Sequence, residues 1–269
     1  MKKPEMTVAV IGYGAIGRVL ASELLADAHA PGLAGVLVRS ARDEARSNLP
    51  ADVPVLTSIE ELLVLAPDIV AECAGQEALV HFAPTLLSAG IDVMAISTGA
   101  LARPGILDDW VARAKTGRAQ LFVPAGAIAG LDGLGAHRLA GLSSVTYTSI
   151  KPPIAWQGTP AENMLTLEAI HERTVFFEGS AREAAVSYPK NANLAATVAL
   201  AGIGLDETAV RLVADPAATG NTGVIEAESA IGSLRIEMAG KASANPKTSA
   251  STAYSLAYSL KNLTSTMVI

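Results

Sequence analysis

Three glycines near the amino terminus form the most chemically specific spacing in the chain. Gly12, Gly14 and Gly17 follow the apolar run Thr7–Ile11 and lead into an amphipathic segment, so a G-x-G-x-x-G pattern lies between a strand and a helix. Here the first glycine makes the tight turn, the second lets the backbone approach a pyrophosphate, and the third permits close helix–strand packing. Free N–H groups at the helix start attract phosphate. The pattern predicts dinucleotide binding; a turn without ligand and an adenosyl-methionine fold with a similar loop are the alternatives.

The residues after the second predicted strand determine which dinucleotide fits. An acidic side chain about twenty residues beyond the glycines would bind the ribose 2′-hydroxyl of NAD. This chain has Arg39, Ser40 and Arg42 there instead. Guanidinium groups bind a phosphate bidentately and stack on adenine, so we predict NADP(H), with NAD(H) use also open; two solvated surface arginines are the structural alternative. The further cofactor contacts that we expect are Ala15, Ile16 and Ala74.

The elements that position these residues follow from the hydrophobic pattern. The first 123 residues alternate short apolar runs with amphipathic stretches, which is typical of βαβ units and a parallel sheet. The predicted strands are Thr7–Ile11, Leu33–Arg39, Ile69–Ala74, Asp92–Ile96 and Gln120–Val123. The predicted helices are Ile16–Ala28, one opened by a Ser58-x-x-Glu61 capping box, one ending near Ala89, and one with Pro104 in its first turn.

After Val123 the pattern changes. Alternating runs at Val145–Ser149 and Ser233–Met238 indicate a mixed or antiparallel sheet with one solvated face. Helices are predicted at Ala181–Tyr188, at Asn193–Ile203 and in the tail after Pro246. We therefore predict an α/β chain: a doubly wound Rossmann domain over 1–124, an α+β domain over 125–245, and a helix within 246–269 that packs back on the first domain.

Bulk composition excludes several classes. The chain has 269 residues, a net charge of −6 and a pI near 5.3, which argues against a nucleic-acid surface or an anionic membrane as partner. Its single cysteine, Cys73, excludes an internal disulfide and a zinc cluster, and no histidine pair has metal-ligand spacing. There is no signal-peptide pattern and no uncharged stretch long enough for a membrane span. We therefore predict a soluble cytoplasmic protein without a metal site.

Several longer segments carry a family resemblance. They are Glu72–Gly75, Gly126–Ile128, Tyr147–Trp156, Phe177–Ala185, Tyr188–Gly202 and Asn245–Ser249. Over nearly its whole length the chain resembles the L-aspartate dehydrogenase family. The resemblance implies a two-domain homodimer, dimerising through the second domain, that interconverts L-aspartate with oxaloacetate and ammonia through iminoaspartate. It also implies that the Ala127 backbone amide and Asn193 contact the nicotinamide end of the cofactor; for Asn193, a helix cap is the structural alternative.

Three positions depart from the family pattern. The catalytic histidine of the family falls at Gly223, an arginine at Ile150 and a serine at Ala125. Each change makes the expected pocket less polar, which indicates a pocket rebuilt for a less polar substrate. Lys151 is retained beside the altered Ile150, where it could bind a carboxylate or, if desolvated, shuttle the amine proton; a surface or structural lysine is the alternative.

We therefore predict an NAD(P)H-dependent oxidoreductase that oxidises an amine or reduces an imine, acting on a small amine or carbonyl compound less polar than aspartate. The expected substrate pocket is Ala125, Ile150, Lys151, Asn193 and Gly223. L-Aspartate dehydrogenase proper is one alternative, with water or Lys151 replacing the imidazole. A non-catalytic dinucleotide-binding protein that lost its acid/base at Gly223 is the other.

Overall fold

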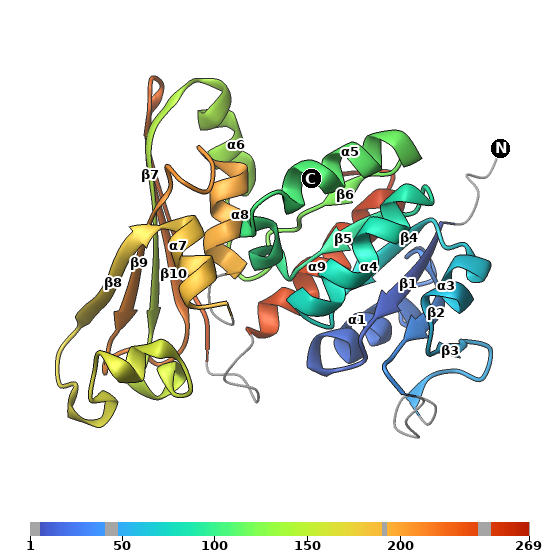
Figure 1. The fold of residues 1–269 in the computed structure, drawn as a ribbon, viewed down its shortest axis with the longest axis horizontal. Coiled ribbons are helices and arrows are strands. Elements are labelled where there is room, and N and C mark those ends of the chain that lie inside the picture. The colour runs from blue at the N-terminus through green and yellow to red at the C-terminus, as the bar shows by residue number, and fades with distance from the viewer. Residues whose placement is uncertain (1–5, 41–47, 190–192, 242–248, 269) are drawn as a thin grey trace. The chain divides into compact units, whose positions relative to one another are not determined.

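The chain folds into two compact units. A computed structural model describes residues 6–40, 48–189, 193–241 and 249–268. The described parts of 1–100, 105–124 and 252–269 form the first unit, and 101–104 with the described parts of 125–251 form the second (Figure 1). Among the described residues, no helix is both long enough and apolar enough to cross a membrane.

The first unit is built on a six-stranded parallel sheet. The strand order is β3-β2-β1-β4-β5-β6. Strands β2 and β3 are added on one side of β1 and strands β4 to β6 on its other side, so the strand order reverses between β1 and β4. The strands are β1 (Thr7–Ile11), β2 (Gly32–Leu37), β3 (Val55–Leu56), β4 (Ile69–Glu72), β5 (Asp92–Ala95) and β6 (Leu121–Phe122). The helices are α1 (Ala15–Leu25), α3 (Ile59–Leu65), α4 (Gln76–Ser88), α5 (Ile106–Gly117) and α9 (Ala250–Thr264), with the 3₁₀ helix η1 (Thr98–Ala102). This confirms the predicted Rossmann fold.

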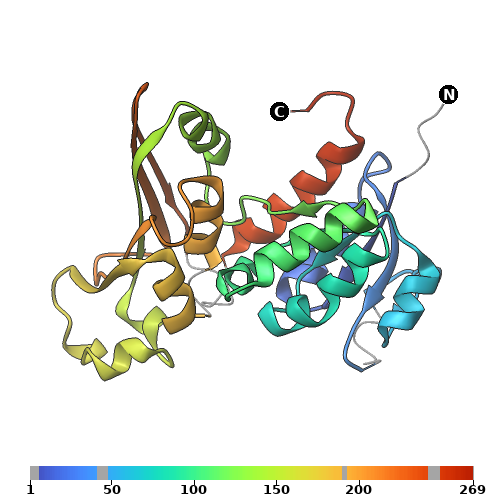
Figure 2. The ribbon, with the colours of Figure 1, turned by 45° about the horizontal axis from the view of Figure 1, so that its top comes forward.

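Helices cover both faces of this sheet, which explains its continuously apolar strands. Leu20 and Leu24 of α1 and Leu256 and Leu260 of α9 pack in one core with Val8 of β1. Figure 2 shows α4 and α5 side by side on the other face, in agreement with their contacts. The tail helix is therefore an integral part of the first core.

Two helix starts can be compared with their sequence signals. The Ser58–Glu61 capping box is confirmed: the Glu61 N–H donates to Ser58 Oγ, and the Ser58 N–H donates to Glu61 Oε2. The prediction that Pro104 lies in the first turn of a helix is wrong. Gly105 adopts a left-handed conformation (φ +75°) as the N-cap and α5 begins only at Ile106, so Pro104 precedes the helix.

The second unit is a five-stranded mixed sheet with helices on one face, as Figure 1 shows. The order is β11-β10-β7-β9-β8; β7 pairs with β9 in parallel and the other pairs are antiparallel. The strands are β7 (Leu142–Lys151), β8 (Thr174–Ser180), β9 (Ala209–Ala214), β10 (Thr222–Ser229) and β11 (Gly232–Ala239). The helices are α6 (Leu131–Leu139), η2 (Pro153–Trp156), η3 (Pro160–Asn163), η4 (Leu167–Ala169), α7 (Ala181–Ser187) and α8 (Asn193–Ala201).

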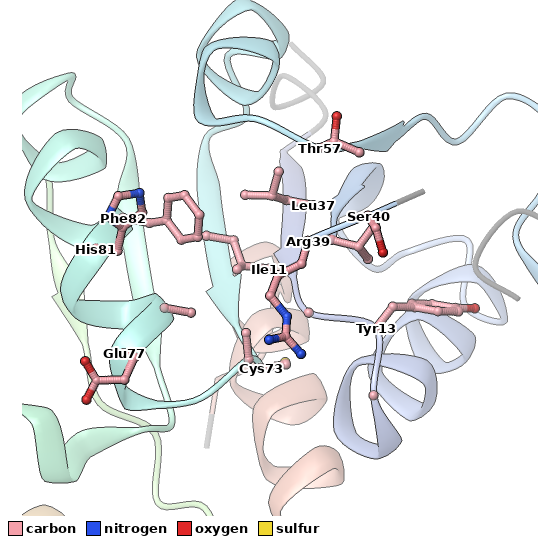
Figure 3. A pocket seen from close by; sticks show the side chains of 15 residues that line it. Ile11, Tyr13, Leu37, Arg39, Ser40, Thr57, Cys73, Glu77, His81 and Phe82 are labelled. Carbon is pink, nitrogen blue, oxygen red and sulfur yellow. The ribbon is translucent and has the colours of Figure 1, made fainter. Parts of the chain in front are cut away.

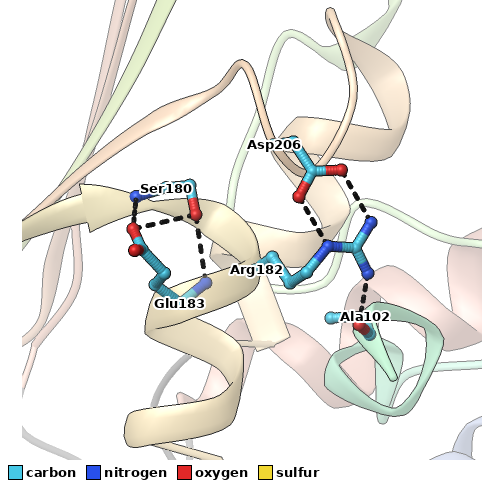
Figure 4. A network of polar contacts seen from close by, with 5 residues as sticks. All are labelled: Ala102, Ser180, Arg182, Glu183 and Asp206. Atoms are coloured by element: carbon cyan, nitrogen blue, oxygen red, sulfur yellow. Dashed lines mark hydrogen bonds and ion pairs between the residues drawn. The ribbon is translucent and has the colours of Figure 1, made fainter. Parts of the chain in front are cut away.

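The segment that begins α7 carries one of the family-like motifs, and its residues have structural roles. Ser180 and Glu183 form a second capping box (Figure 4). Arg182 makes a bidentate ion pair with Asp206, at 2.6 and 2.8 Å, and donates a third hydrogen bond of 2.6 Å to the Ala102 carbonyl. This guanidinium therefore fastens the short 101–104 segment to the second unit.

Candidate functional site

The glycine-rich turn has the geometry that dinucleotide binding requires. Gly12 has φ +94°, and a Cβ there would lie 2.9 Å from Ala74 Cα. A Cβ at Gly17 would lie 2.1 Å from the Gly12 carbonyl oxygen, so only glycine permits this packing of α1 on the turn. A Cβ at Gly14 would meet no atom within 4 Å, which leaves space for a ligand. Gly14 caps α1 without a side-chain hydrogen bond and the first turn has no acidic residue, so this helix start suits an anion.

A pocket of about 790 Å³ opens at the carboxyl ends of the strands beside this turn (Figure 3). Because the strand order reverses between β1 and β4, this is where dinucleotides bind in open parallel sheets. Its lining residues are Ile11, Gly12, Tyr13, Gly14, Leu37, Val38, Arg39, Ser40, Thr57, Cys73, Ala74, Glu77, Ala78, His81 and Phe82. Of the predicted cofactor residues, the pocket brings together Gly12, Gly14, Arg39, Ser40 and Ala74.

The end of β2 carries the chemistry that selects between the two dinucleotides. β2 ends at Leu37, so Arg39 and Ser40 lie beyond the strand, and Figure 3 shows the Arg39 side chain reaching into the pocket. Among the described residues that line the pocket, the acidic one is Glu77 of α4, and those at the end of β2, up to Ser40, include no acid. Arg42 lies outside the described residues. The structure therefore presents one cation where NAD-specific sites carry an acid.

Sequence reasoning missed the part of the pocket contributed by Thr57 and by α4. Thr57 lies just before α3, whereas Ala78, His81 and Phe82 lie on α4. His81 has its ring 4.7 Å from that of Phe82, edge to face. The available signal was positional: α4 follows β4, the strand beside the reversal point, and its first turns must therefore border the ligand crevice.

In the second unit, the alternation of β7 places Tyr147, Ser149 and Lys151 on one face of the sheet. Tyr147 packs in the core formed with α6, α7 and α8, which identifies this as the helix-covered face. β10 pairs Gly223 directly with Ser149, so Gly223 lies on the same face. A Cβ at Gly223 would lie 2.8 Å from Ile128 Cδ1 and 3.3 Å from the Tyr147 hydroxyl oxygen. The end of the Ile128 side chain therefore occupies the space beside this glycine.

Of the predicted pocket residues, Ile150 packs on the other face of the sheet from this group. Ile150 is 8 % exposed and packs with Val213 and Val224 on the opposite face of the sheet. The physical reason is the two-residue period of a strand, because neighbours in sequence point to opposite faces. Ile150 and Lys151 therefore leave the end of β7 on opposite faces of the sheet.

Lys151 is the most strongly perturbed cation of the described chain. Its Nζ lies 4.7 Å from the centroid of the Trp156 ring, and Trp156 is itself fully buried with its Nε1 donating to the Val213 carbonyl. Burial lowers the pKa of Lys151 from 10.5 to about 8. An amine with this pKa is partly neutral near physiological pH and can accept and return a proton.

The remaining predicted residues of the second unit lie near Gly223. Ala125 and Ala127 flank Gly126, whose added Cβ would lie 3.6 Å from Leu194 Cδ2, so this segment adjoins the start of α8 at Asn193. Because Ile128 in turn reaches Gly223, the structure gathers the 125–128 segment, the start of α8 and Gly223 in one region. That Ala127 and Asn193 contact the cofactor remains a prediction.

The other ionisable candidates have local roles. His137 Nδ1 lies 2.8 Å from Ser229 Oγ, and the His29 N–H donates to Asp27. Within the described residues, no group of three or more His, Cys, Asp or Glu side chains could hold a metal ion. Lys151, with its lowered pKa, is therefore the group of the second unit best suited to proton transfer.

Comparison with known proteins identifies the family. Residues 132–263 match the family described as aspartate dehydrogenase, C-terminal, and residues 12–124 match the homoserine dehydrogenase NAD-binding domain. L-Aspartate dehydrogenase of Cupriavidus taiwanensis is 45 % identical over 256 residues, covering 95 % of this chain and 96 % of that protein. L-Aspartate dehydrogenase of Pseudomonas aeruginosa is 40 % identical over 264 residues, covering 96 % and 97 %.

A solved structure agrees. The crystal structure of aspartate dehydrogenase from Thermotoga maritima superposes with a TM-score of 0.77 at 29 % identity, covering 98 % of this chain and 99 % of that one. The two family matches and this superposition together cover both units of the chain, including the glycine-rich turn. The chain belongs to the L-aspartate dehydrogenase family and is an NAD(P)-dependent dehydrogenase that acts on a carbon–nitrogen bond.

Proposed function

We propose that this dehydrogenase oxidises an amine, or reduces the corresponding imine, whose side chain is less polar than that of aspartate. The observation that carries the proposal is Gly223, which stands where the family resemblance expects a histidine, with Ile128 Cδ1 filling the adjoining space. A methyl group in place of an imidazole offers a carboxylate no hydrogen bond, and a buried carboxylate without a partner is costly. Ala125, in place of the serine that the family resemblance expects, removes a hydroxyl group and so supports the proposal as well. Ile150 does not support it, because Ile150 packs on the face of the sheet opposite to Gly223.

Lys151 is proposed to carry the proton. When bound, the nicotinamide ring accepts the hydride from the amine-bearing carbon or returns it. The neutral Lys151 amine takes one proton from the substrate ammonium group, and the hydride then leaves carbon so that an iminium ion forms. In the reducing direction the Lys151 ammonium returns that proton. The support is the position of Lys151 on the same face as Gly223 and the lowering of its pKa to about 8.

L-Aspartate dehydrogenase activity itself is the second candidate. It is favoured by relatives of that name at 40–45 % identity over nearly the whole chain. In this case the Lys151 ammonium would pair with a substrate carboxylate rather than carry a proton.

The deciding experiment is steady-state reductive amination with NADPH. Oxaloacetate with ammonia is compared with a panel of apolar ketones and amines. The proposal expects kcat/KM for the best apolar pair to exceed that for oxaloacetate by about tenfold or more, the range in which pocket contacts discriminate substrates. A preference for oxaloacetate overturns it and leaves the second candidate.

We further propose that the cofactor is NADP(H) in preference to NAD(H), and that the enzyme is a homodimer. Arg39, which lines the pocket just beyond the end of β2, supports the first proposal. The family resemblance supports the second, together with exposed apolar side chains of the second unit, Ile154, Met164 and Val175. Titration with NADPH and NADH compares their Kd values and tests the first proposal. Size-exclusion chromatography with light scattering measures the molar mass in solution and tests the second.

A further inference from the structure

A buried carboxylate lies at the end of β4 and has no part in the proposed proton transfer. Glu72 is fully buried, and its side chain accepts four hydrogen bonds. Its Oε1 accepts from the Ala74 N–H at 2.7 Å, the Gly75 N–H at 2.6 Å and Ser97 Oγ at 3.0 Å; its Oε2 accepts from the Ser97 N–H at 3.1 Å. Glu72 therefore joins the turn after β4 to Ser97 in the segment that follows β5.

The four donors favour the ionised form of the Glu72 carboxyl group. Burial raises the pKa of Glu72, while the hydrogen bonds from Gly75, Ser97 and Ala74 oppose this shift. Three of the donors are backbone N–H groups, which cannot accept a proton in exchange. A carboxylate satisfies all four donors, and a buried N–H that loses its acceptor is left unpaired.

The turn that Glu72 holds is part of the dinucleotide pocket. Cys73 and Ala74 line the pocket, and the backbone of Ala74 lies so close to Gly12 that an added Cβ there would come within 2.9 Å of it. The glycine-rich turn thus packs directly against a segment whose backbone N–H groups donate hydrogen bonds to Glu72. If Ala74 moves towards Gly12, the Gly12 turn has to move with it, because the Cα, Cβ and N atoms of Ala74 all lie close to this glycine.

We propose that Glu72 is a positioning residue for the dinucleotide: its carboxylate holds the Ala74–Gly75 amides, and through Ala74 the Gly12 turn, in the arrangement that binds the cofactor. This inference uses only the cofactor site and does not depend on the substrate proposed above. The competing explanation is that Glu72 merely stabilises the sheet. The two differ in what its removal does to cofactor affinity in protein that remains folded.

The test compares Glu72→Gln with Asp68→Asn on the full-length protein. Asp68 precedes β4 at the opposite end of the strand, where its carboxylate accepts from the Thr7 N–H at 2.7 Å and from Thr7 Oγ1 at 2.9 Å. The control substitution removes an exposed carboxylate that, like Glu72, accepts hydrogen bonds at an end of β4, but at the end away from the pocket. The measurements are the Kd of NADPH by fluorescence titration, the KM for NADPH against kcat, amide hydrogen exchange at Ala74, Gly75 and Ser97 without cofactor, and Tm.

If the glutamine variant adopts the binding arrangement in about one molecule in ten, its Kd and KM for NADPH rise about tenfold, since apparent affinity scales with the competent fraction. We expect this rise with kcat at saturation unchanged, together with faster exchange of the three amides. Asp68→Asn should leave the Kd unchanged. A folded Glu72→Gln protein whose Tm falls but whose Kd stays within about twofold overturns the proposal.

Ser97→Ala is the milder variant in case Glu72→Gln fails to fold. It removes one donor, the Ser97 hydroxyl, and leaves the carboxylate in place. We expect a smaller rise in the Kd of NADPH, with faster exchange at Ala74 and Gly75. An unchanged Kd in this variant, or a rise that Asp68→Asn reproduces, shows that the contacts support the sheet alone and rejects the positioning role.

Discussion

Replacing Lys151 tests whether a desolvated amine carries the proton in this enzyme. Burial lowers the pKa of Lys151 from 10.5 to about 8. At pH 7 about one tenth of such amines are neutral, against about one in 3,000 at the ordinary pKa, so burial supplies roughly 300-fold more free base. Lys151→Met, which keeps the length and loses the amine, should lower kcat/KM by about 10²-fold or more.

The pH dependence makes the assay specific. In amine oxidation, kcat/KM should rise with pH through an inflection near 8, whereas imine reduction should fall through the same inflection, because the two directions need opposite protonation states of Lys151. Lys151→Arg should abolish the inflection in both directions, since arginine does not titrate there. Lys115→Met, an exposed lysine of α5, is the control and should change neither rate. Retention of the inflection in both Lys151 variants refutes the assignment.

The same pKa shift predicts a stability effect. A lysine whose folded-state pKa is lowered binds fewer protons in the native than in the unfolded protein between about pH 8 and 10.5. The free energy of unfolding should therefore rise with pH across this window, relative to that of Lys151→Met. The stability gained in this way should be lost again as the pH falls towards 8. Denaturant unfolding of the two proteins at several pH values measures the difference; parallel curves would contradict it.

Three further substitutions test individual residues of the cofactor pocket and of the predicted substrate pocket. Arg39→Asp should weaken NADPH binding by about 1–3 kcal/mol with little loss for NADH, as titration can show; a strong NADH preference in the unmutated protein would exclude a 2′-phosphate site. Gly223→His should raise aspartate dehydrogenation once Ile128 Cδ1 has turned away, and unchanged aspartate activity in a folded, cofactor-binding variant would place position 223 outside the site. Ile150→Arg, which puts a charge against Val213 and Val224, should lower Tm rather than improve aspartate turnover; a variant of normal Tm with better turnover would contradict its placement.

The glycine-rich turn of the cofactor pocket could be predicted because its parts are close together in sequence. Gly12, Gly14 and Gly17 are separated by only one or two residues, and local steric demands on the turn determine their identity. The Ser58–Glu61 capping box was predictable for the same reason. Thr57 and His81 were missed because they enter the pocket from segments whose position depends on the folded sheet.

The predicted substrate residues show where sequence reasoning stopped. The alternation at Val145–Ser149 indicated a strand, and extending it would have separated Ile150 from Lys151, but the family comparison grouped them by adjacency. Only the folded structure shows that Ile128 fills the space beside Gly223, because the pairing of β10 with β7 sets this glycine opposite Ser149 and close to Ile128. Sequence alone determined the Rossmann fold, the dinucleotide turn and the family, since these depend on short-range backbone geometry and hydrophobic period. Tertiary structure decided which side chains share a face and which amine is desolvated, because strand register and burial are set by contacts between residues far apart in the chain.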